Sequence, residues 1–322
     1  MKGKRNSMNT KKLMSAALAA LLLAGCSAGG TAGGDAAGTT ETAAAENLKI
    51  LSPTGAPSLS LLPIVLGGKN TVETVEGADL LQAALVNPDA EYDVIICPTN
   101  LGVKLASAGK TDYRLLDVVT WGNLYIIGSD ESDLEAGHKV AAFGEQAVPG
   151  LVFKKTYSDI GADVSFAYQT GQETMAALLS GDADAALIAE PAATAAIAKG
   201  KEQGKEFKVI SDVQKEWGEN GFPMAGLFVN SKTYEENKAM ITDLVNQMKE
   251  FTDGVNPDDA SALIDALNQA GIEQFGVPSA EIIGKCWKRM NISIRDAAEC
   301  KDDVAAFLKV FGVDNVDGAF AE

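Results

Sequence analysis

Four predicted junctions between a strand and a helix carry proline together with small polar or acidic residues. Proline suits the first helical turn because its φ is already helical and its missing N–H has no intrahelical partner there. The other N–H groups of a first turn are free to bind an anion, and in open parallel sheets such junctions face the ligand crevice. Each junction alone is also compatible with an ordinary helix start. Together they predict a site for a carboxylate, sulfonate, phosphate or nitrate, built from residues 52–58, 97–100, 143–149 and 189–192.

Glu190 is the most informative single candidate, because it is an ionisable residue between an apolar strand and a helix start. In a structural interpretation, its carboxylate pairs with the positive end of the helix dipole. In a functional interpretation, it accepts a hydrogen bond from an amine or an amidine-like edge of a ligand. The functional interpretation does not fit a purely anionic ligand, and the sequence leaves both open.

An aromatic residue and an amide, Trp121 and Asn123, precede the predicted strand 124–128. Both side chains could reach the mouth of a cleft, although Trp121 is equally suited to core packing. The other two tryptophans, Trp217 and Trp287, fall in predicted helix or loop, and we interpret them as structural.

The sequence argues against metal-dependent and histidine-dependent catalysis. His138 is the only histidine, which excludes most zinc sites and any histidine-dependent triad that is not built on it. It follows Gly137 at a strand entrance, where we expect a surface loop. Residues 108–111 superficially resemble the end of a phosphate-binding loop, but Lys104 stands where the first glycine is required and the segment closes a helix. No cofactor and no metal are predicted.

The chain begins with a pattern typical of a secretion signal that ends in a lipid attachment site. Lys11 and Lys12 precede the apolar run 13–23, which is long enough for a signal peptide and too short for a membrane span. The segment Leu-Ala-Gly-Cys at 23–26 resembles the lipobox of bacterial lipoproteins, whose cysteine receives a diacylglycerol and becomes the first mature residue. An ordinary signal peptide with a chance cysteine is the alternative. We therefore predict a signal peptide over 1–25, lipidation at Cys26, and a flexible tether over 26–46.

Three cysteines remain once Cys26 is assigned to lipid, so at least one has no partner within the chain. Cys286 and Cys300 could form a disulfide, which would add about 3 kcal/mol of stability in the chain-entropy model. Two buried free thiols are an equally good interpretation. Cys97 lies in a predicted apolar strand.

The acidic composition limits the kinds of partner. The net charge is −17, and removal of the five basic residues of segment 1–25, which has no acidic residue, leaves about −22. This charge argues against nucleic acid and against anionic lipid headgroups as partners. A small anionic ligand is still compatible with it, because local donors can capture an anion in an acidic protein.

Short apolar strands alternate with helical segments, which predicts an α/β fold with mainly parallel strands. Beyond Val229 the pattern is nearly all helical, and the segment 131–217 can form an inserted second domain. We expect lobe 1 from residues 47–128 and 219–322 and lobe 2 from 129–218, joined by two crossings near 124–130 and 212–224. The predicted strands are 48–52, 92–97, 124–128, 139–143, 164–168, 185–189, 208–211 and 225–229.

The mature chain resembles the solute-binding lipoproteins of ABC importers, in particular the nitrate, sulfonate, taurine and thiamine-precursor type. Three stretches carry the resemblance: 48–57, 92–100, and 178–186 followed by Glu190-Pro191. The last has the helix, Gly-Asp-x-Asp turn, strand and Glu-Pro junction of these proteins. The match spans nearly the whole mature chain in order, although each motif alone is of modest specificity.

The resemblance implies a two-lobed type II periplasmic-binding-protein fold that closes on a small solute and delivers it to a membrane permease. It implies an exported, monomeric, non-enzymatic protein that is anchored through Cys26 to the outer face of the bacterial cell membrane or is periplasmic, with no nucleic acid partner. The sequence departs from sulfonate binders in having no arginine at the junctions. Position by position, the implied ligand contacts are Thr54, Gly55, Ala56, Thr99, Asn100, Thr120, Trp121, Gly144, Gln146 and Glu190.

Two other functions are compatible with this pattern. One is an enzyme on the same fold that acts on a pyrimidine or carboxylate metabolite, because some relatives of the family are catalytic. Export, a single histidine and the lack of a paired acid and base argue against it. The other is a lipoprotein that only docks a sensor or another protein, which predicts no closing cleft.

Overall fold

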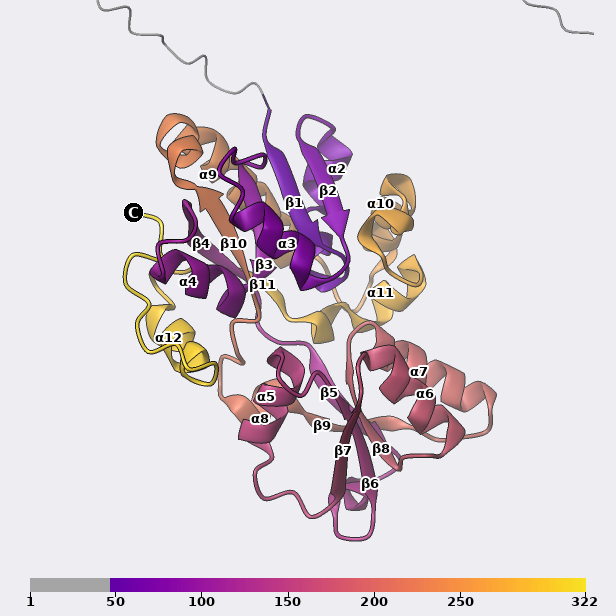
Figure 1. Cartoon of the computed structure of the whole chain (residues 1–322). Coiled ribbons are helices and arrows are strands. Elements are labelled where there is room, and N and C mark those ends of the chain that lie inside the picture. Colours follow the sequence, from indigo (N-terminus) through magenta and orange to yellow (C-terminus); the bar gives the residue numbers. More distant parts are fainter. Residues whose placement is uncertain (1–46) are drawn as a thin grey trace, which may run out of the picture. The chain divides into compact units, whose positions relative to one another are not determined.

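The computed structural model describes residues 47–322. The predicted signal peptide, the lipid site at Cys26 and the tether lie outside the described residues. Two sheets organise the described part of the chain, one with six strands and one with five (Figure 1). We call each sheet with its helices a lobe.

The six-stranded sheet has the order β11-β4-β10-β3-β1-β2. Strands β2 and β3 pair parallel to β1, whereas β10 runs antiparallel to both β3 and β4, and β11 runs antiparallel to β4. Alternate side chains fill two cores, so that Ile50 and Ile96 face one side and Leu51 and Ile95 the other. The strands are β1 (Lys49–Pro53), β2 (Thr71–Val75), β3 (Val94–Pro98), β4 (Tyr113–Thr120), β10 (Ala225–Asn230) and β11 (Ile292–Asp296).

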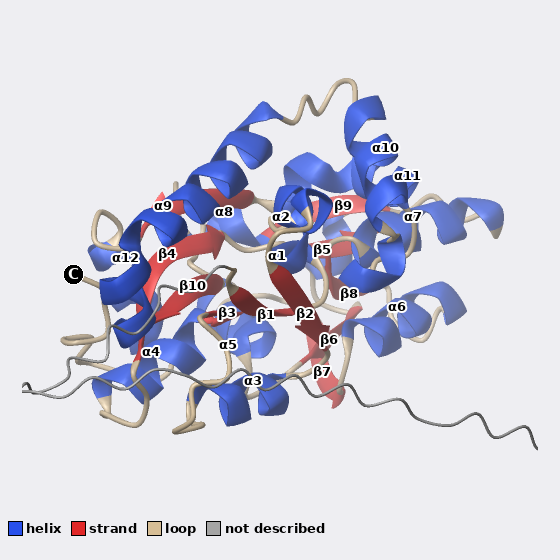
Figure 2. Ribbon diagram, turned by 90° about the horizontal axis from the view of Figure 1, so that it is seen from above, coloured by secondary structure: helices blue, strands red, loops and turns tan. Residues whose placement is uncertain are grey.

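Helices cover both faces of this sheet, as Figure 2 shows. On one face lie α3 (Ala78–Leu85), α4 (Thr99–Ser107) and α12 (Lys301–Lys309), and on the other α2 (Leu62–Gly67) and α9 (Ser231–Gly254). A third core joins the short α1 to α2 and to the C-terminal helical segments. These are α1 (Ala56–Leu59), α10 (Ser261–Ala270), α11 (Ala280–Cys286) and the 3-10 turns η2 (Ile272–Phe275) and η3 (Trp287–Met290).

The five-stranded sheet has the order β7-β6-β8-β5-β9. Leu124 and Ile126 of β5 face the core under α5 (Val148–Thr156) and α8 (Val213–Trp217). Tyr125 and Ile127 face the opposite core under α6 (Gly171–Ser180) and α7 (Ala192–Glu202). The strands are β5 (Leu124–Gly128), β6 (Lys139–Phe143), β7 (Asp163–Tyr168), β8 (Ala185–Ala189) and β9 (Lys208–Asp212), with the turn η1 (Glu131–Leu134) before β6.

The chain passes between the sheets at residues 121–123, the first crossing, and at 218–224, the second crossing. Each crossing contains a glycine with positive φ, Gly122 at 81° and Gly221 at 71°. A Cβ at Gly221 would overlap the carbonyl oxygen of Trp121, and a Cβ at Gly122 would overlap Gln214 and Phe222. The two crossings therefore pack against each other, and glycine permits both the contact and the conformation.

The structure corrects three sequence-based expectations about the fold. The strands are not mainly parallel, because β5 and β10 each run antiparallel to their neighbours. Strand β5 hydrogen-bonds within the five-stranded sheet, so residues 124–128 are not part of lobe 1 and the first crossing precedes them. The helical tail beyond Val229 contains a strand, β11, which adds to β4.

The remaining cysteines and the histidine have clear positions. Cys97, Cys286 and Cys300 are free and buried, so the disulfide interpretation of the last two is wrong. His138 lies on the surface just before β6, as predicted, with Nδ1 3.8 Å from Asp133 Oδ1 and 3.7 Å from Asp184 Oδ2. Among the described residues, no group of three His, Cys, Asp or Glu side chains is placed to hold a metal ion.

Candidate ligand-binding site

A pocket of about 390 Å³ lies where strands of both sheets end. The six-stranded sheet contributes the segments after β1 and β3, the end of β4 and the start of β10. The five-stranded sheet contributes the start of β5, the end of β8 and the segment after β6. The interlobe pocket is lined by Pro53, Thr54, Gly55, Ala56, Pro57, Pro98, Thr120, Asn123, Ala147, Val148, Pro149, Ala189, Glu190, Met224 and Ala225.

The lining of the interlobe pocket is mostly apolar. Proline, alanine, valine and methionine supply most of it, and none of the described lining residues is Lys, Arg or His. Glu190 is the only ionisable one. A pocket of this size with an apolar wall and a few polar groups is typical of small-molecule sites.

Three of the N–H groups that were predicted to bind an anion, at the junctions after β1 and β3, are donated within the protein. Those of Thr54 and Gly55 bond to Val75 O at 3.1 Å and Phe275 O at 2.8 Å. That of Thr99 bonds to Met224 O at 3.1 Å. Neighbouring segments, which the sequence pattern did not place here, supply these acceptors. The predicted cradle of free N–H groups is therefore wrong at these positions.

The other junctions bring few free N–H groups to the interlobe pocket, because Asn100, Ala192 and Ala193 do not line it. The N–H of Glu190 bonds to Asn123 O at 2.9 Å, and Pro98 and Pro191 stand at N-cap positions instead of the predicted first helical position. Among the junction residues that line the interlobe pocket, Ala56 and Val148 have N–H groups without an acceptor in the described part of the chain. They belong to different lobes.

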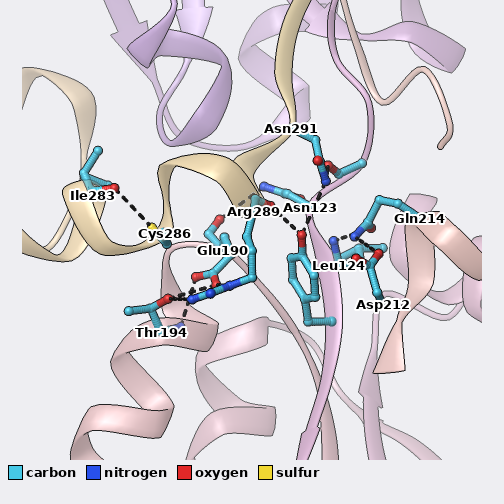
Figure 3. A network of polar contacts seen from close by, with 12 residues as sticks. Asn123, Leu124, Glu190, Thr194, Asp212, Gln214, Ile283, Cys286, Arg289 and Asn291 are labelled. Atoms are coloured by element: carbon cyan, nitrogen blue, oxygen red, sulfur yellow. Dashed lines mark hydrogen bonds and ion pairs between the residues drawn. The ribbon is translucent and has the colours of Figure 1, made fainter. Parts of the chain in front are cut away.

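The carboxylate of Glu190 is committed to partners inside the protein. Its Oε2 accepts from Thr194 N at 3.0 Å, and its Oε1 accepts from Thr194 Oγ1 at 2.9 Å and from Arg289 Nε at 2.7 Å. Figure 3 shows the Arg289 side chain lying along both residues. The Glu190 side chain is 0% exposed and both of its oxygens are already paired, so its carboxylate is not available to a ligand. The expectation that it accepts from an amine of the ligand is corrected by this pairing, and what Glu190 presents to the pocket is main chain.

The segment that carries Arg289 is hydrogen-bonded to the first crossing and to the start of β5 (Figure 3). Tyr125 Oη donates to Arg289 O at 2.7 Å, and Asn291 Nδ2 donates to Gly122 O at 3.0 Å. Trp121 Nε1 donates to Ser293 O at 3.0 Å. Burial raises the pKa of Tyr125 well above its usual value of 10, which keeps its hydroxyl available as a donor. Turn η3 and the residues after it therefore hold the first crossing from the lobe 1 side.

Asn123 was expected near the cleft mouth but was not among the implied ligand contacts, and it lines the interlobe pocket. It is only 6% exposed, and its Nδ2 donates to Glu190 O at 3.1 Å. Its Oδ1 is buried and has no hydrogen-bond partner among the described residues. The position of Asn123 directly before β5 was the available signal, because the start of an antiparallel strand lies at the same edge as the ends of its neighbours.

The structure brings together only part of the predicted contact set. Thr54, Gly55, Ala56, Thr120 and Glu190 line the interlobe pocket. Thr99 and Asn100 do not line this pocket. Thr99 is fully buried, and neither its Oγ1 nor the Oδ1 of Asn100 has a hydrogen-bond partner among the described residues. Trp121 is 2% exposed, stacks under the guanidinium of Arg295 at 4.2 Å and borders a different pocket of about 340 Å³. Gly144 and Gln146 do not line the interlobe pocket.

Most of the remaining lining residues lie in the predicted junctions but were not among the implied contacts, whereas Met224 and Ala225 come from a strand that the sequence analysis did not assign to the site. Met224 and Ala225 arrive with β10, which inserts antiparallel between β3 and β4. Val148 and Pro149 open α5 and lie in a junction that was predicted, although the residues chosen there were others. The local sequence does not show that β10 inserts between β3 and β4, which is why Met224 was not predicted to line the pocket.

A nucleophile beside the Glu190 cluster is unreactive. Cys286 is buried, and this burial raises the pKa of its thiol to about 12. A neutral thiol is a poor nucleophile.

The described residues also contain no helix long and apolar enough to cross a membrane.

Comparison of the chain with protein-family models and with curated proteins finds no match. Several solved structures match its fold. An ABC transporter structure from Parabacteroides distasonis is 20% identical, covers 86% of this chain and 97% of its own, and has a TM-score of 0.67. The periplasmic aliphatic sulphonate binding protein SsuA from Escherichia coli is 18% identical, with 86% and 92% covered and a TM-score of 0.65. The periplasmic nitrate-binding protein NrtA from Synechocystis PCC 6803 is 13% identical, with 74% and 68% covered and a TM-score of 0.51.

These similarities confirm the predicted two-lobed α/β fold of periplasmic binding proteins. Two of the three neighbours are, by name, binding proteins for small oxyanions or sulfonates. The similarity in fold leaves the ligand of this chain to be argued from its own pocket.

Proposed function

We propose that the chain is the extracytoplasmic solute-binding component of an ABC importer, acting as a monomer. The observation that carries the proposal is the interlobe pocket of about 390 Å³, which is lined by segments of both sheets next to two glycine-containing crossings. Its structural neighbours include binding proteins for sulfonate and nitrate. A solute in this pocket touches both lobes at once.

The mechanism follows from this placement. Contacts to the two lobes are made simultaneously only when the lobes approach, so the solute favours the closed form by as much as it binds that form better. Residues 121–123 and 218–224 are the chain segments able to absorb such a motion. A permease would then distinguish the loaded from the empty protein by its shape.

A binding function fits the pocket better than catalysis. Acid–base catalysis needs a titratable group within reach of the substrate. The only ionisable lining residue, Glu190, has a fully buried carboxylate that is paired with Arg289. The pocket of the described chain thus holds and orients a molecule without a group placed to transfer a proton.

A thermal-shift screen combined with small-angle X-ray scattering tests the proposal. The compounds are alkyl and aryl sulfonates, nitrate, bicarbonate, carboxylates, aminopyrimidines, vitamin precursors and uncharged amides. A ligand at about a hundred times its dissociation constant adds about 2.7 kcal/mol of stability, and closure should reduce the radius of gyration. Stabilisation without a change in the radius would contradict closure, and no hit in any class would favour a docking lipoprotein.

Two neighbouring substitutions show whether a hit uses the interlobe pocket. Ala147 and Gln146 are both exposed and adjacent in the chain, but only Ala147 lines the pocket. Ala147→Trp should fill the pocket and abolish the ligand-induced shift, while Gln146→Trp should leave the shift unchanged. Equal losses in the two variants would place the ligand at the contacts carried over from the sequence resemblance.

Lipid anchoring at Cys26 is a separate part of the proposal and is supported by the sequence pattern alone. Cys26→Ser removes the thiol that would receive the diacylglycerol. The variant should appear in the medium or periplasm and not in the membrane fraction, and this is measured by cell fractionation and blotting. The matched substitution Ser27→Ala should stay with the membrane. Membrane retention of Cys26→Ser would refute lipidation there.

A further inference from the structure

We propose that the solute of the interlobe pocket is uncharged, with an apolar body and an N–H or O–H group that donates to Asn123 Oδ1. This proposal rests on the proposed function and specifies its substrate class. It differs from the sulfonate and nitrate named for two structural neighbours. Three features of the pocket support it: an unpaired acceptor, the fixed orientation of that acceptor, and the absence of a counter-charge for an anion.

Asn123 supplies an acceptor that the protein leaves unused. The residue lines the pocket, is 6% exposed, and its Oδ1 has no partner among the described residues. A buried polar atom without a hydrogen bond destabilises the protein. A hydrogen-bond donor on a bound molecule would remove this destabilisation, so ligand binding and hydrogen bonding of Asn123 Oδ1 are coupled.

The orientation of the Asn123 amide is fixed by its other end. Nδ2 donates to the carbonyl oxygen of Glu190 at 3.1 Å. The N–H of Glu190 in turn donates to Asn123 O at 2.9 Å, so two hydrogen bonds join these residues. If the amide were rotated by 180°, Asn123 Oδ1 would face the carbonyl oxygen of Glu190, and two acceptors would then lie against each other. The unpaired atom of this amide is therefore an acceptor and not a donor.

No counter-charge for an anion lines the pocket. The described lining residues include no Lys, Arg or His, and the N–H groups of Thr54 and Gly55 are already donated to Val75 O and Phe275 O. Burying an unpaired charge is strongly unfavourable. Sulfonate and nitrate oxygens are acceptors only, so they would also face Asn123 Oδ1 without a hydrogen bond.

A cation is equally unsuited to this pocket. The one carboxylate at its edge, that of Glu190, is 0% exposed and already bonded to Arg289 at 2.7 Å. The wall is instead made of proline, alanine, valine and methionine side chains. These favour an uncharged apolar body, and the N–H groups of Ala56 and Val148 remain to bind an acceptor on the same molecule.

Calorimetric titration of the purified protein with five compounds of one skeleton tests the substrate class. The probes are benzamide, N,N-dimethylbenzamide, benzoate, benzenesulfonate and benzamidinium. Benzamide should bind about tenfold more tightly than its dimethyl analogue, a difference of about 1.4 kcal/mol, because only benzamide has an N–H to donate. It should also bind more tightly than the three charged probes.

Two variants show whether Asn123 causes the preference. Asn123→Ala should reduce the tenfold ratio between benzamide and N,N-dimethylbenzamide to about one. Asn291→Ala is the matched control, since Asn291 Nδ2 donates to Gly122 O at 3.0 Å but Asn291 does not line the interlobe pocket. This variant should keep the ratio, which separates loss of the pocket acceptor from loss of an amide hydrogen bond near the crossing.

Each other outcome overturns the proposal in a way that is distinct from failure of the proposed function. Tighter binding of benzenesulfonate or benzoate would refute the uncharged class while supporting solute binding. An unchanged ratio in Asn123→Ala would refute the role of its Oδ1. Absence of binding by all five probes would refute the class for this pocket, and the wider screen with its scattering measurement would still decide the proposed function.

Discussion

Replacing Arg289 by methionine is expected to destabilise the protein by about 3 kcal/mol. The substitution keeps a long apolar side chain but removes the donors to Glu190 Oε1 at 2.7 Å and Thr194 Oγ1 at 2.6 Å. Removal of one partner from a buried ion pair typically costs about 3–5 kcal/mol because the other charge stays buried. The low end applies, since 37% of the Arg289 side chain is exposed whereas none of that of Glu190 is. Urea unfolding at pH 7.5 measures the loss.

The reverse substitution should cost less, and this asymmetry is the sharper test. Glu190→Gln leaves an uncharged side chain that still accepts from Thr194 N, and the partly exposed guanidinium of Arg289 can be hydrated. The double variant should be more stable than Arg289→Met alone, because it removes the unpaired carboxylate. Equal losses of unfolding free energy in Glu190→Gln and Arg289→Met would contradict this explanation, in which the cost depends on how deeply the remaining charge is buried.

Replacing Asp117 by asparagine is expected to stabilise the protein by up to about 3 kcal/mol above pH 6. Asp117 is 6% exposed on β4, and burial, followed by the nearby Asp296, raises its pKa from 3.8 to about 6, while Lys249 lowers it. A raised carboxyl pKa means that the folded state prefers the protonated form. The difference between about 6 and 3.8 corresponds to about 3 kcal/mol, which is an upper limit for the gain.

The pH dependence identifies the cause of this gain. Stability contributed by the protonated Asp117 is fully present below pH 3.8 and is lost as the pH rises to about 6. The difference in unfolding free energy between Asp117→Asn and the wild type should therefore be small at pH 4 and largest at pH 7.5. Comparing the two proteins at each pH cancels the contribution of the other groups. A difference that does not change with pH would attribute the effect to packing.

Strands with continuous apolar sequences were predicted well. β5, β6 and β8 have the predicted bounds, and β1 and β3 are shifted by one or two residues. The runs are unmistakable because these strands are buried on both faces, so successive residues are apolar instead of alternating. Local signals also mark some helix starts, since the side chains of Thr170 and Ser279 accept from N–H groups in the first turns of α6 and α11.

Strands that depend on their neighbours were missed. β4 contains Arg114 and Asp117, and its pattern is broken although most of the strand is buried. β2 lies at the sheet edge, and its residues are exposed or half-buried. β11 exists because β4 offers an edge on which it can pair. In each case the hydrogen-bonding partner, distant in the chain, stabilises a strand that its own residues do not specify.

The sequence by itself determined the α/β class, the order of the buried strands, the prolines at the strand ends, and Glu190 as a residue of the site. These follow from local patterns, since apolar runs and helix caps act over a few residues. Only the tertiary structure decided what those residues do. Arg289, 99 residues along the chain, pairs the Glu190 carboxylate away from the pocket. Val75, Phe275 and Met224 take the N–H groups that sequence alone left free, and Asn123 Oδ1 remains as an unpaired acceptor. The physical reason is that hydrogen-bond partners are chosen by proximity in the fold, so the free polar atoms of a pocket are known only after all the other pairs have formed.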